Sequence, residues 1–280
     1  MREKLISKDD LRKIHPIFRG RFGEILIKMV FSFTGVNKVN GVYDGSKHKT
    51  GEAFTSDLLD RQNIIRIVEN YEVLDFFKDQ AFITVTNHPY GHIDGITIIS
   101  VIAAKRKDYK LMANWMLTRI DTMEDHFIGV NPYSKDTKMS TLKSSLGGVK
   151  QCLEHIKEGH PLGFFPAGGV SNCHLTYTKD REWQAPVIKL IKKAKMPVIP
   201  VFISGNNSWL YRFLGIINWR VRMFRLMHEV TNKKGKKIYI RFGKPITVEE
   251  QSQFEDIKAF GEFLKKKTYE LQKERSPGVF

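Results

Sequence analysis

The chain has 280 residues, with 46 Lys and Arg against 30 Asp and Glu, so its formal net charge is +16. This length fits one α/β domain or at most two small ones, and a hydrophobic content of 41% argues against disorder. Two cysteines cannot form a disulfide framework or a zinc site made of cysteine pairs. No stretch of roughly 20 apolar residues is present, so we expect no membrane span, and no secretory signal is recognised.

Helix-patterned and strand-patterned segments alternate along the chain. Helices are predicted over residues 22–33, 56–69, 94–105, 138–158, 183–194 and 257–271. Short apolar runs predict buried strands over residues 81–86, 110–115, 127–130, 161–165, 197–203 and 237–242. This alternation predicts an α/β fold with a mostly parallel central sheet flanked by helices, preceded by an N-terminal amphipathic helix. We expect an N-terminal helical segment over 1–37, one main domain over 38–247, and a C-terminal helix within 248–280 that packs on that domain.

The helix predicted over 138–158 has one apolar stripe, which we expect to face the core. Its members are Leu142, Leu146, Val149, Leu153 and Ile156.

Positive charge is concentrated between residues 189 and 244, where 14 Lys and Arg face the single acid Glu229. This concentration predicts one strongly basic face. Its partners would be polyanions such as nucleic acid, an anionic membrane or a phosphorylated carrier.

A dense polar cluster, Thr-Asn-His-Pro-Tyr-Gly-His-Ile-Asp-Gly, follows the predicted strand at 81–86. The carboxyl edge of an open α/β sheet is where such folds bind ligands. His88 is the candidate general base, and Asp94 would fix its tautomer. Two alternatives stay open: Asp94 caps the following helix, or His88, His92 and Asp94 bind a metal ion. We expect no metal.

A second cluster, Gly-Phe-Phe-Pro-Ala-Gly-Gly-Val-Ser, occupies residues 163–171. A strand that leads into Pro and two glycines makes a loop whose N–H groups can meet an anion, although it can equally be a simple tight turn. Neither a Walker A loop nor a Gly-x-Gly-x-x-Gly turn is present, so nucleotide binding has little support.

Together the two clusters resemble the glycerolphosphate and lysophospholipid acyltransferase superfamily, which includes 1-acylglycerol-3-phosphate acyltransferases. That family combines an Asn-His block and a later Asp, a Phe-Pro-Glu-Gly-Thr-Arg-Ser block, and a strand similar to Val-Pro-Ile-Val-Pro-Val. The counterparts here are Asn87-His88 with Asp94, residues 165–171 and residues 196–201, while residues 127–132 fit an intervening block loosely. The resemblance covers about residues 39–247. It implies acyl transfer with His88 as base and no resident cofactor.

Two departures narrow the resemblance. Five residues separate His88 from Asp94 where most of the family has four. Ala167 and Val170 replace the Glu and Arg of the family's Phe-Pro-Glu-Gly-Thr-Arg-Ser block. In the family that Arg-bearing block is associated with the acceptor's phosphate, so its loss argues against lysophosphatidate as acceptor. The pattern is similar to a hemolysin-like subgroup, some of whose members O-acylate lyso-forms of amino-acid lipids.

The resemblance therefore implies transfer of a fatty acyl group from an acyl carrier protein or coenzyme A thioester to the hydroxyl of a lyso-lipid. A 1-acylglycerol-3-phosphate acyltransferase is the alternative, and a hydrolase using water as acceptor is a further one. The residues expected to bind substrate are Asn87, Pro166, Gly168, Gly169 and Ser171, and bracing of the turn is the alternative role for Asn87. The N–H groups near Gly168 and Gly169 would meet the oxyanion.

Residues 209–227 mix aromatic side chains with arginines, a composition suited to the headgroup region of an anionic membrane. The expected contacts are Arg212, Trp219, Arg220, Arg222 and Arg225. A core helix with solvated arginines is the alternative. We expect a cytoplasmic protein, peripheral on the inner face of the cell membrane. A basic nucleic-acid-binding protein is the alternative from another class, but no recognition motif supports it, so no nucleic-acid partner is expected.

Overall fold

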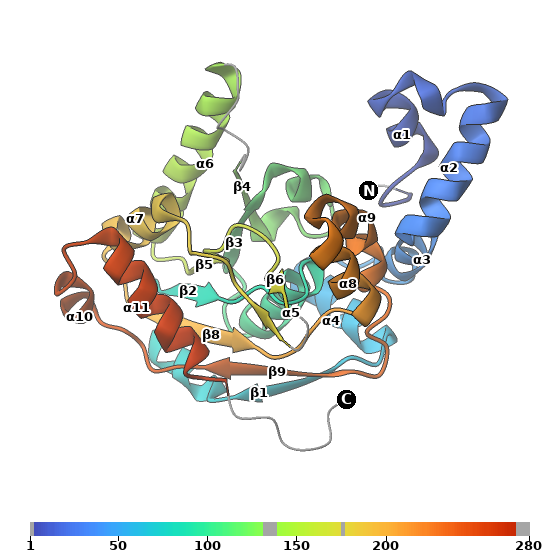
Figure 1. Ribbon diagram of the computed structural model, residues 1–280. Helices are drawn as coiled ribbons and strands as arrows, with labels where there is room; N and C mark the ends of the chain where they lie inside the picture. The colour runs from blue at the N-terminus through green and yellow to red at the C-terminus, as the bar shows by residue number, and fades with distance from the viewer. Residues whose placement is uncertain (1–2, 131–138, 175–176, 273–280) are drawn as a thin grey trace.

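A seven-stranded sheet forms the centre of the protein (Figure 1). The computed structural model describes residues 3–130, 139–174 and 177–272. The strands are β1 (Ile65–Glu69), β2 (Ile83–Thr86), β3 (Lys110–Asn114), β4 (Phe127–Val130), β5 (Leu162–Phe164), β8 (Val198–Ile203) and β9 (Lys237–Phe242). Their order is β1-β9-β8-β2-β5-β3-β4, and every neighbouring pair is parallel except β8 and β9. The predicted mostly parallel sheet is confirmed.

Helices cover both faces of this sheet. One face packs against α3 (Val36–Ser46), α4 (Gly51–Arg61) and α5 (His92–Ile102), and the other against α6 (Met139–Lys157), α7 (Ala185–Ala194) and α11 (Ile257–Tyr269). Successive strand residues point to opposite faces, so in β8 Ile199 joins the first core and Val198 the second. The central strands β2, β5 and β8 are therefore buried on both faces, as their continuous apolar runs predict.

The remaining elements lie around the rim of these layers. They are α1 (Lys8–Ile14), α2 (Gly20–Thr34), α8 (Trp209–Ile217), α9 (Trp219–Glu229), α10 (Val248–Ser252), the 3₁₀ turns η1 (Pro16–Phe18), η2 (Tyr71–Phe77), η3 (Trp115–Arg119) and η4 (Glu124–His126), and the hairpin of β6 (Asn172–Cys173) and β7 (Thr178–Lys179). In Figure 1, α1, α2 and α3 stand on the right beside α8 and α9, while α7, α10 and α11 lie on the left.

The helix predicted over 56–69 is wrong in its second half. Helix α4 ends at Arg61, and β1 begins at Ile65. Asn63 has a φ of 51°, in the left-handed region, and this conformation ends the helix. Residues 65–69 then pair in parallel with β9, which makes them an edge strand of the sheet. The pairing partner lies far along the chain, so the local pattern did not reveal it.

The other predicted helices are present with shifted ends. In the stripe of α6, Ile156 is buried but Val149 is exposed, so the stripe is not core throughout. The side chains of Leu142 and Leu146 lie outside the described residues, as do Asn131 and Pro132. Helix α3 crosses the predicted boundary between 37 and 38, and α11 packs against α7 and β8. Among the described residues, no helix is long and apolar enough to cross a membrane.

Candidate active site

The polar turn after β2 brings His88 and Asp94 together. Asp94 lies in the first turn of α5, where its Oδ2 accepts the N–H groups of Tyr90 and Gly91 at 2.8 Å each. The same oxygen lies 2.9 Å from Nδ1 of His88. Asp94 therefore caps its helix and also contacts the imidazole, so the two interpretations of this residue are compatible.

Both side chains of this pair are largely shielded from solvent. The Asp94 side chain is 0% exposed and that of His88 is 17% exposed. Burial raises the pKa of the Asp94 carboxyl, while His88 and the backbone donors act in the opposite direction. The His88 ring stacks on Phe165, with 4.2 Å between ring centroids. Because Nδ1 faces Asp94, Nε2 is the ring nitrogen left for a substrate.

His92 does not complete a metal site. Burial lowers its pKa to about 4, so this imidazole is neutral at pH 7. Within the described ranges, no group of three or more His, Cys, Asp or Glu side chains is placed to hold a metal ion. The metal alternative therefore has no support from the geometry.

The loop after β5 is both a tight turn and a wall of the site. Gly168 has a φ of 65°, which favours glycine, and its N–H donates to the carbonyl of Phe165 at 2.9 Å. Because this hydrogen bond uses the Gly168 N–H, that group is not available to an oxyanion, which corrects the role expected for Gly168. The N–H of Gly169 has no acceptor among the described residues, and it stays available. Pro166 is buried, and its carbonyl accepts the N–H of Gln184 at 2.8 Å.

Asn87 and Ser171 are buried, and their side chains are engaged within the protein. Asn87 exchanges two hydrogen bonds with the backbone of Ile203, at 2.7 and 2.8 Å, which ties the end of β2 to β8. The Ser171 hydroxyl donates to Asp180 at 2.5 Å, and the Ser171 N–H donates to the His88 carbonyl at 2.9 Å. Both residues hold the turn that carries His88, which is the bracing role expected as the alternative for Asn87, whereas Ser171 was expected to contact the acceptor.

Two arginines flank this loop although Val170 supplies no cation. Arg181 is exposed and donates to the carbonyls of Ala167 and Gly168, at 2.7 and 2.9 Å. Arg222, from α9, donates to the carbonyls of Ser171 and Val170, at 3.2 and 3.3 Å. Sequence analysis missed Arg181, because the charged run at 179–182 has the composition of a solvated loop and no fixed spacing links it to the glycines.

The residues expected at a membrane fall into three groups. Trp219 and Arg220 are exposed, with the Arg220 guanidinium 5.4 Å from the centroid of the Trp219 ring. Arg212 and Arg225 are half-buried. Arg222 is only 7% exposed, which corrects its expected surface position. It is buried because α9 packs over the turn of the site, where Leu226 approaches Gly91.

A second histidine–aspartate contact provides a comparison within the chain. Nδ1 of His160 lies 2.7 Å from Oδ2 of Asp108, and both side chains are partly exposed. Desolvation opposes the charge on Asp108, but hydrogen bonds from Arg106 and His160 outweigh it and lower the pKa of this carboxyl. His160 lies just before β5 begins, at the amino edge of the sheet. The spacing of atoms alone therefore does not distinguish His88, whereas its place at the carboxyl edge and its buried partner do.

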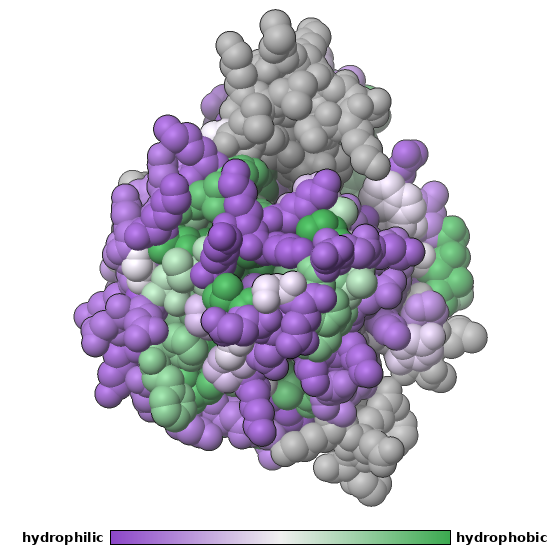
Figure 2. All heavy atoms as spheres, turned by 90° about the vertical axis from the view of Figure 1, so that its left-hand side faces the viewer, coloured by the Kyte–Doolittle hydropathy of each residue, from purple (hydrophilic) through white to green (hydrophobic). Residues whose placement is uncertain are grey.

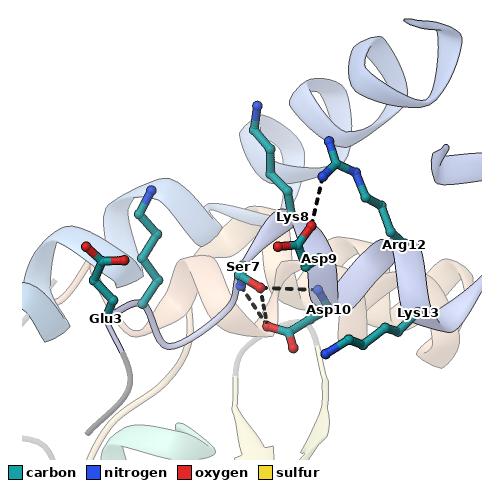
Figure 3. A pocket seen from close by; sticks show the side chains of 8 residues that line it. Glu3, Ser7, Lys8, Asp9, Asp10, Arg12 and Lys13 are labelled. Atoms are coloured by element: carbon teal, nitrogen blue, oxygen red, sulfur yellow. Dashed lines mark hydrogen bonds and ion pairs between the residues drawn. The ribbon is translucent and has the colours of Figure 1, made fainter. Parts of the chain in front are cut away.

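A pocket of about 530 Å³ lies at α1, and none of the site residues described above lines it. Figure 3 shows its lining. Apart from Ser7, its lining from Glu3 to Lys13 is charged. Ser7 and Asp10 hydrogen-bond to each other, and Arg12 pairs with Asp9 at 2.8 Å (Figure 3). Such a lining does not suit an acyl chain, so this pocket is not the candidate site.

Comparison with known proteins finds similarity to acyltransferases. The chain is 24% identical over 246 residues to the lyso-glycine lipid O-acyltransferase of Bacteroides thetaiotaomicron, covering 84% of this chain and 85% of that protein. It is 22% identical over 276 residues to the enzyme of the same name from Phocaeicola vulgatus, covering 94% of each. The crystal structure of the 1-acyl-sn-glycerophosphate acyltransferase PlsC from Thermotoga maritima matches with a TM-score of 0.48 and 17% identity, over 90% of this chain and 97% of that one. A family model described as acyltransferase matches residues 59–278, most of the sequence, and the chain therefore belongs to the acyltransferase family.

Proposed function

We propose that this enzyme transfers a fatty acyl group from an acyl thioester, on acyl carrier protein or coenzyme A, to the hydroxyl of a lyso-lipid at a membrane surface. The observation that carries the proposal is the 2.9 Å contact between His88 and a fully buried Asp94 at the carboxyl edge of the sheet. We do not propose a nucleic-acid-binding protein, because the family is one of enzymes.

General-base catalysis follows from that contact. Nε2 of His88 takes the proton from the acceptor hydroxyl, and the oxygen attacks the thioester carbonyl carbon. Asp94 holds the tautomer in which Nδ1 carries the proton, and it stabilises the imidazolium that forms. The tetrahedral oxyanion accepts a hydrogen bond from the Gly169 N–H. As the intermediate collapses, the C–S bond breaks and the imidazolium returns its proton to the leaving thiolate.

A lyso-amino-acid lipid is the acceptor we favour. The two curated relatives are named for lyso-glycine lipid, and glycine acylated on its nitrogen keeps a free carboxylate. Arg181 places an exposed guanidinium at the Gly168 loop, where it suits an anionic headgroup. A phosphate monoester offers a similar charge, so lysophosphatidate is the alternative acceptor to be tested.

Exposed apolar side chains support action at a membrane. Along α2 they recur at Phe22, Ile25, Met29 and Phe33, and on α8 and α9 they include Trp209, Phe213, Ile216, Trp219 and Phe224. The two groups adjoin, because Arg225 of α9 donates to the Phe33 carbonyl at 3.0 Å. The side of the molecule that carries α7, α10 and α11 is mainly hydrophilic, with small separate apolar patches (Figure 2). An apolar surface beside exposed arginines suits the boundary of an anionic bilayer.

The direct test is an assay of purified enzyme on mixed vesicles. Radiolabelled acyl thioesters of carrier protein and of coenzyme A are offered separately with lyso-glycine lipid, with lysophosphatidate, or with no lipid acceptor. We expect O-acylation of lyso-glycine lipid with little release of free fatty acid. Acylation of lysophosphatidate alone would assign the phospholipid alternative. Release of fatty acid without any acylated lipid would identify a hydrolase.

A further inference from the structure

Asp180, which no sequence pattern singled out, receives hydrogen bonds from His88 and Ser171 of the site and from Trp183 outside it. Its Oδ1 accepts the Ser171 hydroxyl at 2.5 Å and the His88 backbone N–H at 3.2 Å. Its Oδ2 accepts the indole Nε1–H of Trp183 at 3.1 Å. The residue is buried, so these donors replace the water that a carboxylate would otherwise require.

The backbone of Asp180 is held as firmly as its side chain. Its N–H donates to the Tyr269 hydroxyl at 2.8 Å, and Lys265 Nζ donates to its carbonyl at 2.8 Å. Both partners belong to α11, which packs on the sheet. The position of the Asp180 carboxylate is therefore fixed by the rigid layers of the fold.

His88, Ser171 and Asp180 form a closed ring of hydrogen bonds. Asp180 accepts the His88 N–H, the Ser171 N–H donates to the His88 carbonyl, and the Ser171 hydroxyl returns to Asp180. Both backbone polar groups of His88 are thus committed. Phe165 stacks on one face of the imidazole, and Oδ2 of Asp94 lies 2.9 Å from its Nδ1.

We propose that Asp180 is the positioning residue of His88, acting through the backbone of His88 and through Ser171, without touching substrate. This inference rests on the proposed function, since it assigns a role in the same reaction. A displacement of the order of 1 Å in a catalytic group can lower turnover on the order of a hundredfold. Losing the Asp180 acceptor should therefore lower kcat and leave KM nearly unchanged.

The variants are Asp180→Asn and, as matched control, Trp183→Phe. The amide introduced by Asp180→Asn either turns its NH₂ group towards the His88 N–H and breaks the ring, or turns it towards Trp183 Nε1 and leaves a neutral oxygen, a weaker acceptor than the carboxylate, in the ring. Trp183→Phe removes the donor to Oδ2 alone and disturbs the same buried region, while the hydrogen-bonded ring with His88 stays intact. Thermal unfolding of both variants confirms that they fold.

We expect Asp180→Asn to lower kcat ten- to a hundredfold, with KM within threefold of the wild type, while Trp183→Phe keeps kcat within threefold. A merely structural role predicts lower thermal stability in both variants, with kcat of the folded protein unchanged in both. A folded Asp180→Asn variant that turns over within threefold of the wild type overturns the proposal.

Hydrogen exchange of the backbone amides of His88 and Ser171 gives a readout that does not depend on activity. We expect both amides to exchange at least tenfold faster in Asp180→Asn than in the wild type or in Trp183→Phe. Unchanged exchange in Asp180→Asn overturns the positioning role even if the wild-type enzyme proves inactive on every lyso-lipid. Inactivity of the wild type with altered exchange in the variant would contradict the proposed function alone.

Discussion

Replacement of Phe224 by Ser should weaken membrane binding about a hundredfold. A fully covered Phe buries roughly 200 Å², and 61% of Phe224 is exposed in the protein, so roughly 120 Å² leaves water on insertion. At about 25 cal/mol per Å², this burial stabilises the bound state by about 3 kcal/mol. Such a difference corresponds to about two orders of magnitude in the partition coefficient.

The assay is flotation with vesicles of phosphatidylglycerol and phosphatidylcholine at several lipid concentrations. Phe76→Ser is the matched control, because Phe76 is 77% exposed on η2, outside α2, α8 and α9, and the substitution is chemically identical. We expect the control to partition as the wild type does. Equal partitioning of the wild type and both variants, or an equal loss in both variants, would refute the assigned membrane surface.

Three further outcomes follow from buried groups. Lys233→Met should lower the free energy of unfolding by about 3–5 kcal/mol in urea titration, because it leaves the buried Glu229 carboxylate, 2.5 Å from Lys233 Nζ, without its cation. A loss below about 1 kcal/mol would contradict the pairing. Arg222→Gln should lower the melting temperature and leave vesicle binding unchanged, whereas Arg220→Gln, at an exposed position, should weaken vesicle binding and leave the melting temperature unchanged. Equal effects of the two variants would count against their different burial. Burial lowers the pKa of His92 from 6.5 to about 4, so the unfolded chain binds the proton more readily than the folded protein does. The free energy of unfolding should therefore fall by up to about 3 kcal/mol as the pH drops from 6.5 to 4. His92→Leu should make the free energy of unfolding, measured from pH 7 to 4, less dependent on pH, and an unchanged slope in this variant would refute the assignment.

Local patterns predicted most of the sheet, because six of its strands are short apolar runs and the central ones, β2, β5 and β8, are buried on both faces. They failed at β1, where the chain leaves α4 through the left-handed Asn63 and gains its strand partner from residues 237–241. Apolar and charged residues alternate within residues 65–69, but the predicted helix extends through them. Only the parallel pairing with β9 selects the extended conformation.

The candidate site could be predicted where its residues are close along the chain. His88 and Asp94 share one turn, so the turn and the strand before it indicated the pairing while the helix-cap and metal alternatives stayed open, and the resemblance to the acyltransferase superfamily favoured the pairing. Asp180 joins the same site through hydrogen bonds that span 9 and 92 residues. Arg222 was expected at the surface because the composition of its segment does not show which face of α9 packs on Val170 and Ser171.

The most direct test of the account compares His88→Ala with His160→Ala in acyl transfer to the lyso-lipid acceptor. Both variants lose an imidazole whose Nδ1 lies within hydrogen-bonding distance of an aspartate, at 2.9 and 2.7 Å. The account predicts that His88→Ala loses at least about a thousandfold in kcat while it folds and binds vesicles as the wild type does, and that His160→Ala keeps near wild-type turnover. A His88→Ala enzyme that retains more than about a tenth of wild-type kcat, well above what loss of a general base allows, would contradict the mechanism.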